Sequence, residues 1–376
     1  METKTRELKS LKVALVHDWL IHMRGGEKVL ESLAELFPNA VIYTLFYNRE
    51  KLSPALERMK IKSSFLQLIP GIRQFYRWLL PVLPGIMASL KIEEADLVLS
   101  SSHCVAKGIK IPDGAFHICY CHTPMRYLWG YEEEYLGKMP AFMRFLAKYF
   151  LKNLKKADLK SNETVDAFIA NSCNVRDRIQ KFYQRESKVI YPPLDLDRYT
   201  PSRKNGEAGE YYLVVSAFVP YKRVDLVIKA FNLLDRRLLI VGSGPMAAAY
   251  RQVRKSEKIS FLGPVSDQEL QKLYAGAQAL IFPTEEDFGI VPLEAQACGT
   301  PIIAFGKGGA LESVKTGLFF DEQSPEAVRR AVLEFEQKCF DRDKIPPMMS
   351  SFSKESFKTQ CLQFIEEALS APHAAR

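Results

Sequence analysis

The chain has 376 residues, 47% of them hydrophobic and 26% charged, a composition that fits a folded globular protein and excludes extensive disorder. The formal net charge is +8, and residues 1–195 hold the whole excess, with 29 Lys and Arg against 21 Asp and Glu. The remaining residues hold 23 of each sign. This asymmetry predicts that the first half meets an anionic partner.

Seven cysteines, with no C-x-x-C pair and a polar first segment, favour a reduced, cytoplasmic protein. Cys119 and Cys121 stand beside His122 without a usual zinc spacing, so we interpret them as small apolar core residues. No apolar run reaches the roughly 18 residues of a membrane span. We therefore expect no transmembrane helix. Since the cysteines lack a usual zinc spacing, we also expect no metal, and we expect no other cofactor.

The first half alternates short apolar runs with helical segments, which predicts an α/β domain with a parallel sheet. A loop is expected at residues 18–26 and a helix at 27–37. Pro192 and Pro193 end the strand series, and residues 194–209 read as an interdomain connection. The expected strands are 11–16, 96–100, 116–121, 167–170 and 187–191.

The second half repeats this α/β pattern and ends in an amphipathic segment at residues 354–368, after Pro346 and Pro347. We predict one domain over residues 1–195, a second over 196–345, and a last segment, 346–376, that packs back on the first domain. Two such domains imply a cleft between them that takes a ligand. The expected elements are strands 211–215, 238–241, 259–262, 279–282 and 301–304, and helices 224–234 and 324–338.

Distinctive residues follow directly after the expected strands. In parallel sheets these positions share the carboxyl edge, where ligands bind, so their common placement predicts one site. The segments are Gly25-Gly26, His103, His122, Lys222, Gly242-Ser243-Gly244, 286–289 and 306–309.

The most informative segment is PTEEDFGIVPLEA at residues 283–295, which runs from a strand into a helix. Glu286 lies at the turn, and Glu294 is expected in the first helical turn, so both carboxylates can face one cleft. The amino end of a helix also suits an anionic ligand.

Several other candidates keep two interpretations. Gly242 and Gly244 form either a phosphate cradle or a plain tight turn. Lys222 and Arg223 either neutralise a diphosphate or form a solvated pair at a helix start. For His122 we favour a ligand contact or proton transfer over a structural role, with Pro124 able to start a helix.

We interpret three further polar motifs as structural. His17 and His103 also end expected strands, but we favour a structural role for both. The Asp195-Leu196-Asp197 motif lies in the connecting segment, so we do not expect it to bind a metal.

Two basic stretches of the first half also carry aromatic residues. Residues 58–92 contain six Lys and Arg and no acid, and residues 139–156 place Arg144, Lys148, Lys152 and Lys156 at four-residue spacing. Because the aromatics are mixed with long aliphatic residues, we favour contact with an anionic membrane surface over nucleic acid. The alternative is a pair of solvated basic surfaces.

Together these motifs resemble retaining glycosyltransferases of family 4, which have two Rossmann-like domains facing across a cleft, the GT-B fold. The resemblance rests on the E-x7-E pair Glu286 and Glu294, with five further segments in the same order. These are Gly25-Gly26-Glu27, His122-Thr123-Pro124, Val219 to Lys222, Val241 to Pro245, and Gly308-Gly309 with Glu312. Residues 121–129 and 215–226 look most like a bacterial subgroup that includes O-antigen mannosyltransferases using GDP-mannose.

The resemblance implies a role for each matching residue. Glu294 would hold the donor ribose, and Glu286 with the backbone of Phe288, Gly289 and Ile290 would hold the donor sugar. Lys222 would stabilise the diphosphate, Gly25 and Gly26 would approach the donor phosphate and the acceptor, and His122 would contact the sugar near the reacting carbon. Ala217 departs from the family, which often has Arg there, and Arg223 is our candidate for the missing cation.

The implied activity is metal-independent transfer of a hexose, mannose from GDP-mannose, to a lipid-linked or polysaccharide acceptor in cell-surface glycan synthesis. The first domain would face the acceptor and the second would hold the donor. The protein would act in the cytoplasm, peripherally on the inner face of the cell membrane. The alternatives are a nucleotide-sugar 2-epimerase-like isomerase and a non-catalytic subunit that binds nucleotide sugars.

Overall fold

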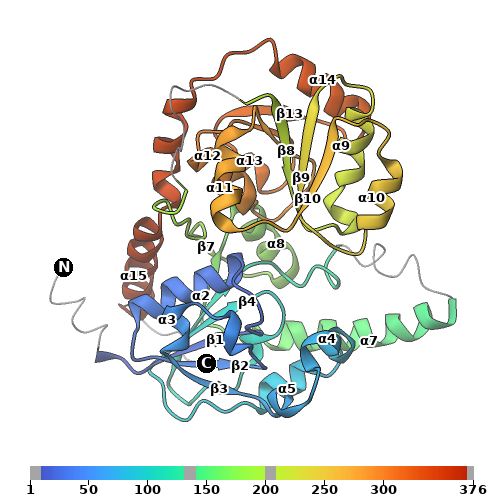
Figure 1. The fold of residues 1–376 in the computed structure, drawn as a ribbon. Coiled ribbons are helices and arrows are strands. Elements are labelled where there is room, and N and C mark those ends of the chain that lie inside the picture. The colour runs from blue at the N-terminus through green and yellow to red at the C-terminus, as the bar shows by residue number, and fades with distance from the viewer. Residues whose placement is uncertain (1–9, 131–140, 200–208, 371–376) are drawn as a thin grey trace. The chain divides into compact units, whose positions relative to one another are not determined.

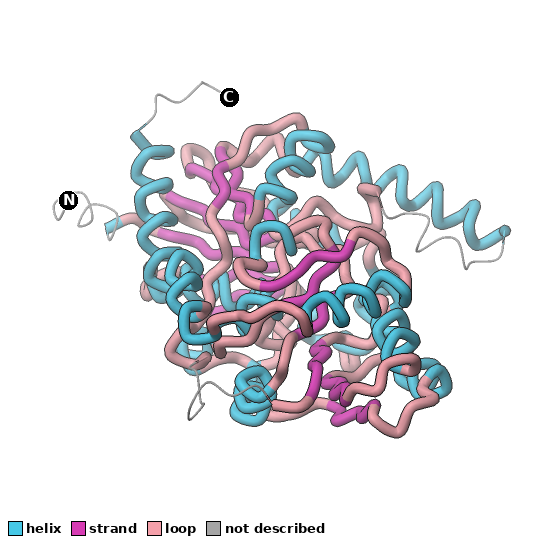
Figure 2. The backbone as a smooth tube through the Cα atoms, turned by 90° about the horizontal axis from the view of Figure 1, so that it is seen from above, coloured by secondary structure: helices cyan, strands magenta, loops and turns pink. Residues whose placement is uncertain are grey.

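The computed structural model describes residues 10–130, 141–199 and 209–370, which form two α/β units (Figure 1). Unit 1 comprises the chain up to Pro193 together with the segment from Phe357, and unit 2 comprises Leu194–Ser356. Residues 346–356 therefore belong with the second unit. Figure 2 shows strands in magenta flanked by helices in cyan.

Unit 1 is built on a parallel sheet of seven strands in the order β3-β2-β1-β4-β5-β6-β7. Its helices are α2 (Gly25–Leu36), α3 (Pro54–Glu57), α4 (Ile72–Phe75), α5 (Leu83–Ser89), α7 (Ala141–Lys160) and α8 (Cys173–Tyr183). Its strands are β1 (Val13–His17), β2 (Val41–Thr44), β3 (Lys60–Ser63), β4 (Leu97–Ser102), β5 (Phe116–Cys121), β6 (Ala167–Ala170) and β7 (Lys188–Val189).

Unit 2 repeats this arrangement with six parallel strands in the order β10-β9-β8-β11-β12-β13. Its strands are β8 (Tyr211–Val215), β9 (Arg237–Val241), β10 (Ile259–Gly263), β11 (Leu280–Phe282), β12 (Ile302–Phe305) and β13 (Gly317–Phe320). Its helices are α9 (Val224–Phe231), α10 (Ala247–Val253), α11 (Asp267–Gly276), α12 (Ile290–Ala297), α13 (Ala310–Ser313) and α14 (Pro325–Phe335).

Both faces of each sheet are buried. Successive strand residues point to opposite sides, and the residues on each side belong to a core cluster. In β1, Val13 and Leu15 join one core cluster while Ala14 and Val16 join another. In unit 2, Tyr212 and Leu213 divide in the same way between two clusters. Because both faces are buried, the strands are near-continuous apolar runs, and the alternation of strands with helices can be recognised in the sequence. The predicted class of two Rossmann-like α/β domains is confirmed.

The last helix, α15 (Lys354–Ser370), begins in unit 2 and continues into unit 1. Phe357, Cys361 and Ile365 are buried in the same cluster as Val13 and Leu15. Lys358 also forms an ion pair with Glu35 of α2. The apolar face of this amphipathic helix is thus part of the unit 1 core.

Some predicted elements differ from the structure. Helix α2 begins at Gly25, two residues before its predicted start, and β7 has only two residues. The expected helix after Pro124 is wrong, because the described residues 122–130 form bends and turns. Strands β2, β3 and β13 were not predicted; β3 and β13 lie at sheet edges, and the sequence of β3, Lys-Ile-Lys-Ser, presents charges as exposed edges often do.

Candidate active site

The first group of predicted residues lies in unit 1, where the strand order reverses between β1 and β4. Ligands of open parallel sheets bind beyond the carboxyl ends of the strands at such a point. His17 is the last residue of β1, and His122 follows β5 directly. The imidazole centroids of His17, His103 and His122 lie 6.0 to 6.5 Å from one another, so the three rings form a histidine cluster at this edge.

His122 is held by both its backbone and its ring. Its amide donates to the Ser102 carbonyl at 2.9 Å, and its carbonyl accepts from the Asn171 side chain at 2.9 Å. The Ser101 hydroxyl lies 2.8 Å from His122 Nε2 and 3.1 Å from His17 Nδ1, so it links the two rings. Burial, followed by the nearby charges of His103 and His17, lowers the pKa of His122 to about 3. At neutral pH this side chain is an uncharged hydrogen-bonding group.

Asp18 holds the histidine cluster in place, a role that the sequence analysis did not predict. Its carboxylate is fully buried and accepts the backbone amides of residues 103–106 at 2.5 to 3.1 Å. It also pairs with His103 Nδ1 at 2.9 Å. Burial alone would raise the pKa of Asp18 and lower that of His103, but their mutual attraction outweighs burial and shifts both the other way. The pair is therefore a buried carboxylate holding an imidazolium.

Gly25 and Gly26 lie at the amino end of α2, close to the histidine cluster. A Cβ at Gly26 would stand 3.5 Å from both His122 Nε2 and His17 Cε1. That distance is an ordinary contact, so a side chain would occupy the space over the two rings rather than clash with them. The structure thus brings Gly25, Gly26 and His122 together, as the sequence predicted.

The second group lies in unit 2, where the strand order reverses between β8 and β11. Lys222 ends a 3-10 turn, Pro220–Lys222, that follows β8, and Glu286 follows β11. Lys222 Nζ forms an ion pair with Glu286 Oε1, and the two side chains remain 17% and 20% exposed. The Thr284 hydroxyl donates to the Lys222 carbonyl at 2.9 Å, which ties the two strand ends together. A lysine has three donors, so Lys222 can keep Glu286 and still donate to an anion.

The backbone after Glu286 is fixed by the glycine turn that follows β12. The Gly309 amide donates to the Glu286 carbonyl at 2.8 Å, and a Cβ at Gly309 would lie 2.2 Å from the Phe288 Cα, so no side chain fits. Phe288 is buried, Gly289 precedes α12, and Ile290 is the first residue of that helix. The segment 286–290 is therefore held in one conformation beside the Lys222–Glu286 pair.

Glu294 lies in the second turn of α12, one turn later than predicted. The hydroxyls of Tyr199 and Tyr274 donate to its two carboxylate oxygens at 2.8 Å each. Burial raises the pKa of Glu294, although the two tyrosine hydrogen bonds and Arg198 act in the opposite direction. Each carboxylate oxygen can accept a further hydrogen bond, so the tyrosines orient Glu294 without using all of its acceptor capacity.

Arg223 and the glycine turn after β9 lie near the same edge. Arg223 Nη1 is 3.4 Å from Gln323 Oε1, and Gln323 donates to the Pro283 carbonyl at 2.8 Å. A Cβ at Gly242 would lie 1.8 Å from the Ser216 carbonyl, so this position requires glycine. The Gly242 amide already donates to the Gly263 carbonyl at 3.0 Å. Gly242 and Gly244 thus let the loop after β8 approach closely, and the Gly242 amide is used within the fold.

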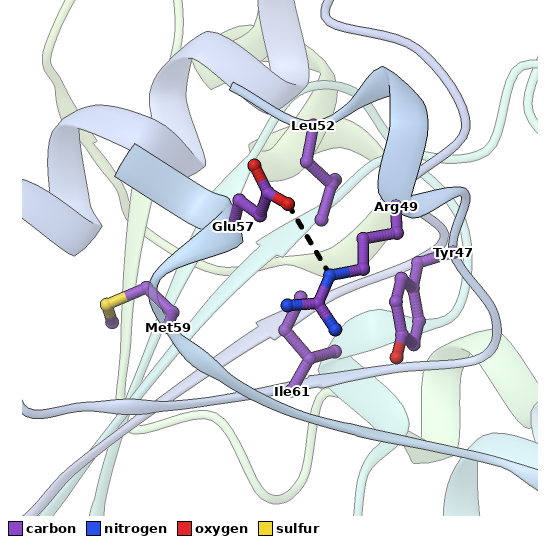
Figure 3. A pocket seen from close by; sticks show the side chains of 6 residues that line it. All are labelled: Tyr47, Arg49, Leu52, Glu57, Met59 and Ile61. Carbon is purple, nitrogen blue, oxygen red and sulfur yellow. Dashed lines mark ion pairs between the residues drawn. The ribbon is translucent and has the colours of Figure 1, made fainter. Parts of the chain in front are cut away.

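A pocket in unit 1 is lined by other residues (Figure 3). Tyr47, Arg49, Leu52, Glu57, Met59 and Ile61 line it, and an ion pair joins Arg49 to Glu57 at 3.5 Å. None of its lining residues was a predicted site residue.

Within the described ranges, no three His, Cys, Asp or Glu side chains are grouped to hold a metal ion. Across the same part of the chain, no helix is both long and apolar enough to cross a bilayer.

Two family matches agree with this division into units. Residues 23–198 match the family described as Glycosyltransferase Family 4, and residues 197–346 match Glycosyl transferases group 1. Each unit of the chain thus matches one glycosyltransferase family. The histidine cluster lies mostly within the first matched range, and the Lys222–Glu286 pair and Glu294 lie within the second.

Relatives with assigned activities are similar to parts of the chain. A D-inositol 3-phosphate glycosyltransferase of Mycobacteroides abscessus is 31% identical over 182 residues, which are 42% of this chain and 41% of the relative. A GDP-mannose-dependent alpha-(1-6)-phosphatidylinositol monomannoside mannosyltransferase of Mycobacterium tuberculosis is 35% identical over 208 residues, 47% of this chain and 53% of the relative. The chain thus spans about half or less of the length of these relatives.

Solved structures show the same fold at low identity. A sucrose-phosphate synthase of Thermosynechococcus elongatus has a TM-score of 0.69 and 17% identity, covering 96% of this chain and 99% of its own. The HepE protein of Anabaena in complex with UDP has a TM-score of 0.67 and 15% identity, covering 95% and 100%. These similarities identify the GT-B architecture of two Rossmann-like domains.

Proposed function

We propose that this protein is a retaining glycosyltransferase that moves a hexose from a nucleotide sugar to a glycan or lipid-linked acceptor. The observation that carries the proposal is the Lys222–Glu286 ion pair at the reversal point of unit 2, followed by Glu294 on α12. Lys222 can bind phosphates, and the Glu294 carboxylate, oriented by the hydroxyls of Tyr199 and Tyr274, can accept hydrogen bonds from hydroxyls. This combination suits a ligand that has both groups.

The proposed donor contacts follow the chemistry of each group. Glu294 accepts hydrogen bonds from the ribose hydroxyls, and Glu286 with the backbone of 288–290 holds the sugar. Lys222 and Arg223 face the diphosphate, while Gly242 and Gly244 allow the loop after β8 to close on the nucleotide. Negative charge develops on the departing diphosphate as the sugar bond breaks, and fixed cations at that position lower the barrier without a metal ion.

In unit 1 we propose that His122 contacts the donor sugar near its reacting carbon. Because its pKa is lowered to about 3, the ring acts as an uncharged hydrogen-bonding partner at neutral pH. Gly26 leaves space above the ring, and we propose that Gly25 and Gly26 approach the donor phosphate and the acceptor there.

Mannose from GDP-mannose is our proposed substrate, supported by the subgroup resemblance and by the mannosyltransferase relative. The acceptor is proposed to be a lipid-linked or polysaccharide precursor of a cell-surface glycan. The protein would act in the cytoplasm, at the inner face of the cell membrane. The basic first half supports contact with anionic lipid.

A thermal-shift panel of nucleotide sugars tests the donor assignment. We expect GDP-mannose to stabilise the protein more than UDP-glucose or UDP-galactose, and the stabilisation to be reduced in Glu294→Gln. Glu257→Gln, which changes an exposed carboxyl of unit 2 outside the predicted site, is the matched control. No shift with any nucleotide sugar would contradict the proposed donor site, and conversion of the donor without acceptor would favour the epimerase alternative.

A further inference from the structure

Residues 64–83 of unit 1 carry apolar side chains on two opposite sides. Leu66, Ile72, Tyr76 and Leu83 are buried in one core cluster of the unit. Between them, five large apolar side chains point outward, and we call these five the docking surface. They are Phe65 at 58% exposure, Leu68 at 83%, Phe75 at 37%, Trp78 at 82% and Val82 at 52%.

The exposure of the docking surface needs an explanation beyond folding. Single exposed apolar residues are common, but five within 18 consecutive residues are unusual on a protein that stays in water. Since the inward residues already complete the core, the outward residues add nothing to it. Their exposure indicates a partner that takes up apolar groups.

The charge around the docking surface identifies the kind of partner. Residues 58–92 hold six Lys and Arg and no acid, and Arg73 and Arg77 are exposed between the apolar side chains. Lys62 of this stretch pairs with Glu93, so the argument rests on Arg73 and Arg77. A surface that mixes aromatics, aliphatics and exposed arginines fits the interface of an anionic bilayer, where apolar groups enter the lipid and cations meet head groups.

The inward side of the segment that carries the docking surface packs toward the histidine cluster. Tyr76 packs on Trp19 with ring centroids 4.8 Å apart, and Trp19 meets His103 edge to face at 4.8 Å. His103 lies 6.4 Å from His122. A path of packed rings within unit 1 therefore joins the outward segment to the proposed reaction site.

Helix α7 lies against the same part of the unit. It contacts α5, and Leu154 is buried in the cluster that holds Leu66 and Leu83 (Figure 1). The helix exposes Phe145 at 74% and Tyr149 at 63%. It is a second stretch with outward aromatics and basic residues, next to the first.

We propose that the docking surface inserts into an anionic lipid bilayer and holds unit 1 at the membrane, where the sugar-bearing end of a membrane-borne acceptor can reach the histidine cluster. The insertion is argued from unit 1 alone, whereas its link to an acceptor rests on the proposed function. The acceptor's lipid then stays in the bilayer, and the contact of the membrane-facing segment with Trp19 and His103 keeps the histidine cluster close to that surface.

Vesicle binding by the full chain tests this proposal. We expect binding to phosphatidylcholine vesicles with about 30% phosphatidylglycerol, and weaker binding when salt rises from about 0.1 to about 0.5 M. Trp78→Glu and Leu68→Glu should each lower the partition coefficient about tenfold or more. Leu233→Glu is the matched control, because Leu233 is 69% exposed in unit 2, and it should change partitioning less than about twofold.

Tryptophan fluorescence reports insertion directly, since the chain has three Trp and Trp78 is the most exposed of them. Brominated lipid should quench the wild-type emission, and Trp78→Phe should remove most of that quenching while vesicle binding remains. Unchanged partitioning of both glutamate variants would overturn the proposal. So would a dimer, seen by sedimentation velocity without vesicles, that Trp78→Glu dissociates, because the occupant would then be a second copy.

Both experiments omit the nucleotide sugar. A failure to bind vesicles would therefore overturn the docking surface while the proposed transfer is judged by its own assay with a water-soluble acceptor. If the wild-type protein binds vesicles but transfers no sugar to the water-soluble acceptor, the proposed function would be contradicted instead.

Discussion

Replacing Asp18 by asparagine removes the charge that anchors the histidine cluster. The wild-type carboxylate accepts four backbone amides and pairs with His103, all around a side chain with no solvent exposure. Asparagine keeps one acceptor oxygen and turns an NH2 group toward donors that cannot accept from it. We expect Asp18→Asn to fold less stably and to loosen the backbone at residues 103–106.

The magnitude follows from the burial of the pair. Breaking a buried ion pair by removing one partner costs about 3–5 kcal/mol. Because the His103 side chain is 36% exposed, water can compensate part of the loss, and we expect about 3 kcal/mol. The matched control is Asp113→Asn, an exposed residue of unit 1, which should change stability by about 0.5 kcal/mol or less.

The pH dependence gives a second readout of the same interaction. The pKa of His103 is raised, so its stabilising contribution is complete below the ordinary value of 6.5 and is lost as pH rises through the folded-state value. The destabilisation by Asp18→Asn should therefore shrink as pH rises above the ordinary histidine value of 6.5 and through the raised pKa of His103. Urea unfolding measures the free energy, and hydrogen exchange should show faster exchange at the amides of 103–106. A loss below about 1 kcal/mol with unchanged exchange would refute the reasoning.

Three further predictions concern the donor side. Lys222→Ala should lower kcat/KM for the nucleotide sugar about 10- to 100-fold, since a charge-assisted hydrogen bond contributes about 1.5–3 kcal/mol, and Lys229→Ala is its control. A loss under about threefold would remove Lys222 as a phosphate ligand. Because the pKa of Glu294 is raised above 4.5, donor affinity measured by calorimetry should fall as pH drops toward that raised value. Glu294→Gln should bind the donor weakly and with little pH dependence. A wild-type affinity that does not change with pH would count against the ribose contact. Arg223→Ala should lower donor turnover if Arg223 supplies the cation absent at Ala217, and unchanged turnover would end that hypothesis.

Much of the fold was predictable because buried parallel strands are continuous apolar runs that end in turn residues. Leu238 to Val241 and Phe116 to Cys121 are of this kind, and both were predicted as strands. The weak cases were short or polar. Strand β3 alternates lysine with other residues at an edge, and β13 is a four-residue strand that begins with glycine, so neither has a distinctive pattern.

The candidate site was predictable where its residues follow strands, as Glu286 and His122 do. The supporting contacts were not, because they depend on tertiary pairing. Asp18 was read as the start of a loop, yet its partners are backbone amides 85 to 88 residues away. Tyr199 meets Glu294 across 95 residues, and a lone tyrosine in a connecting segment has no pattern to mark it. The one available signal was the polar His17-Asp18 pair at the end of an apolar strand.

The most direct test of the proposed function follows nucleoside diphosphate release from GDP-mannose with and without an acceptor. Purified protein would be given GDP-mannose alone, then with a membrane lipid extract as the source of acceptor, beside the Lys222→Ala variant. We predict GDP release that depends on the extract, a mannosylated product that keeps the donor's anomeric configuration, and a loss of about 10-fold or more in the variant. Failure to release a nucleoside diphosphate from any nucleotide sugar under these conditions, or conversion of the donor to another nucleotide sugar without the extract, would contradict the account.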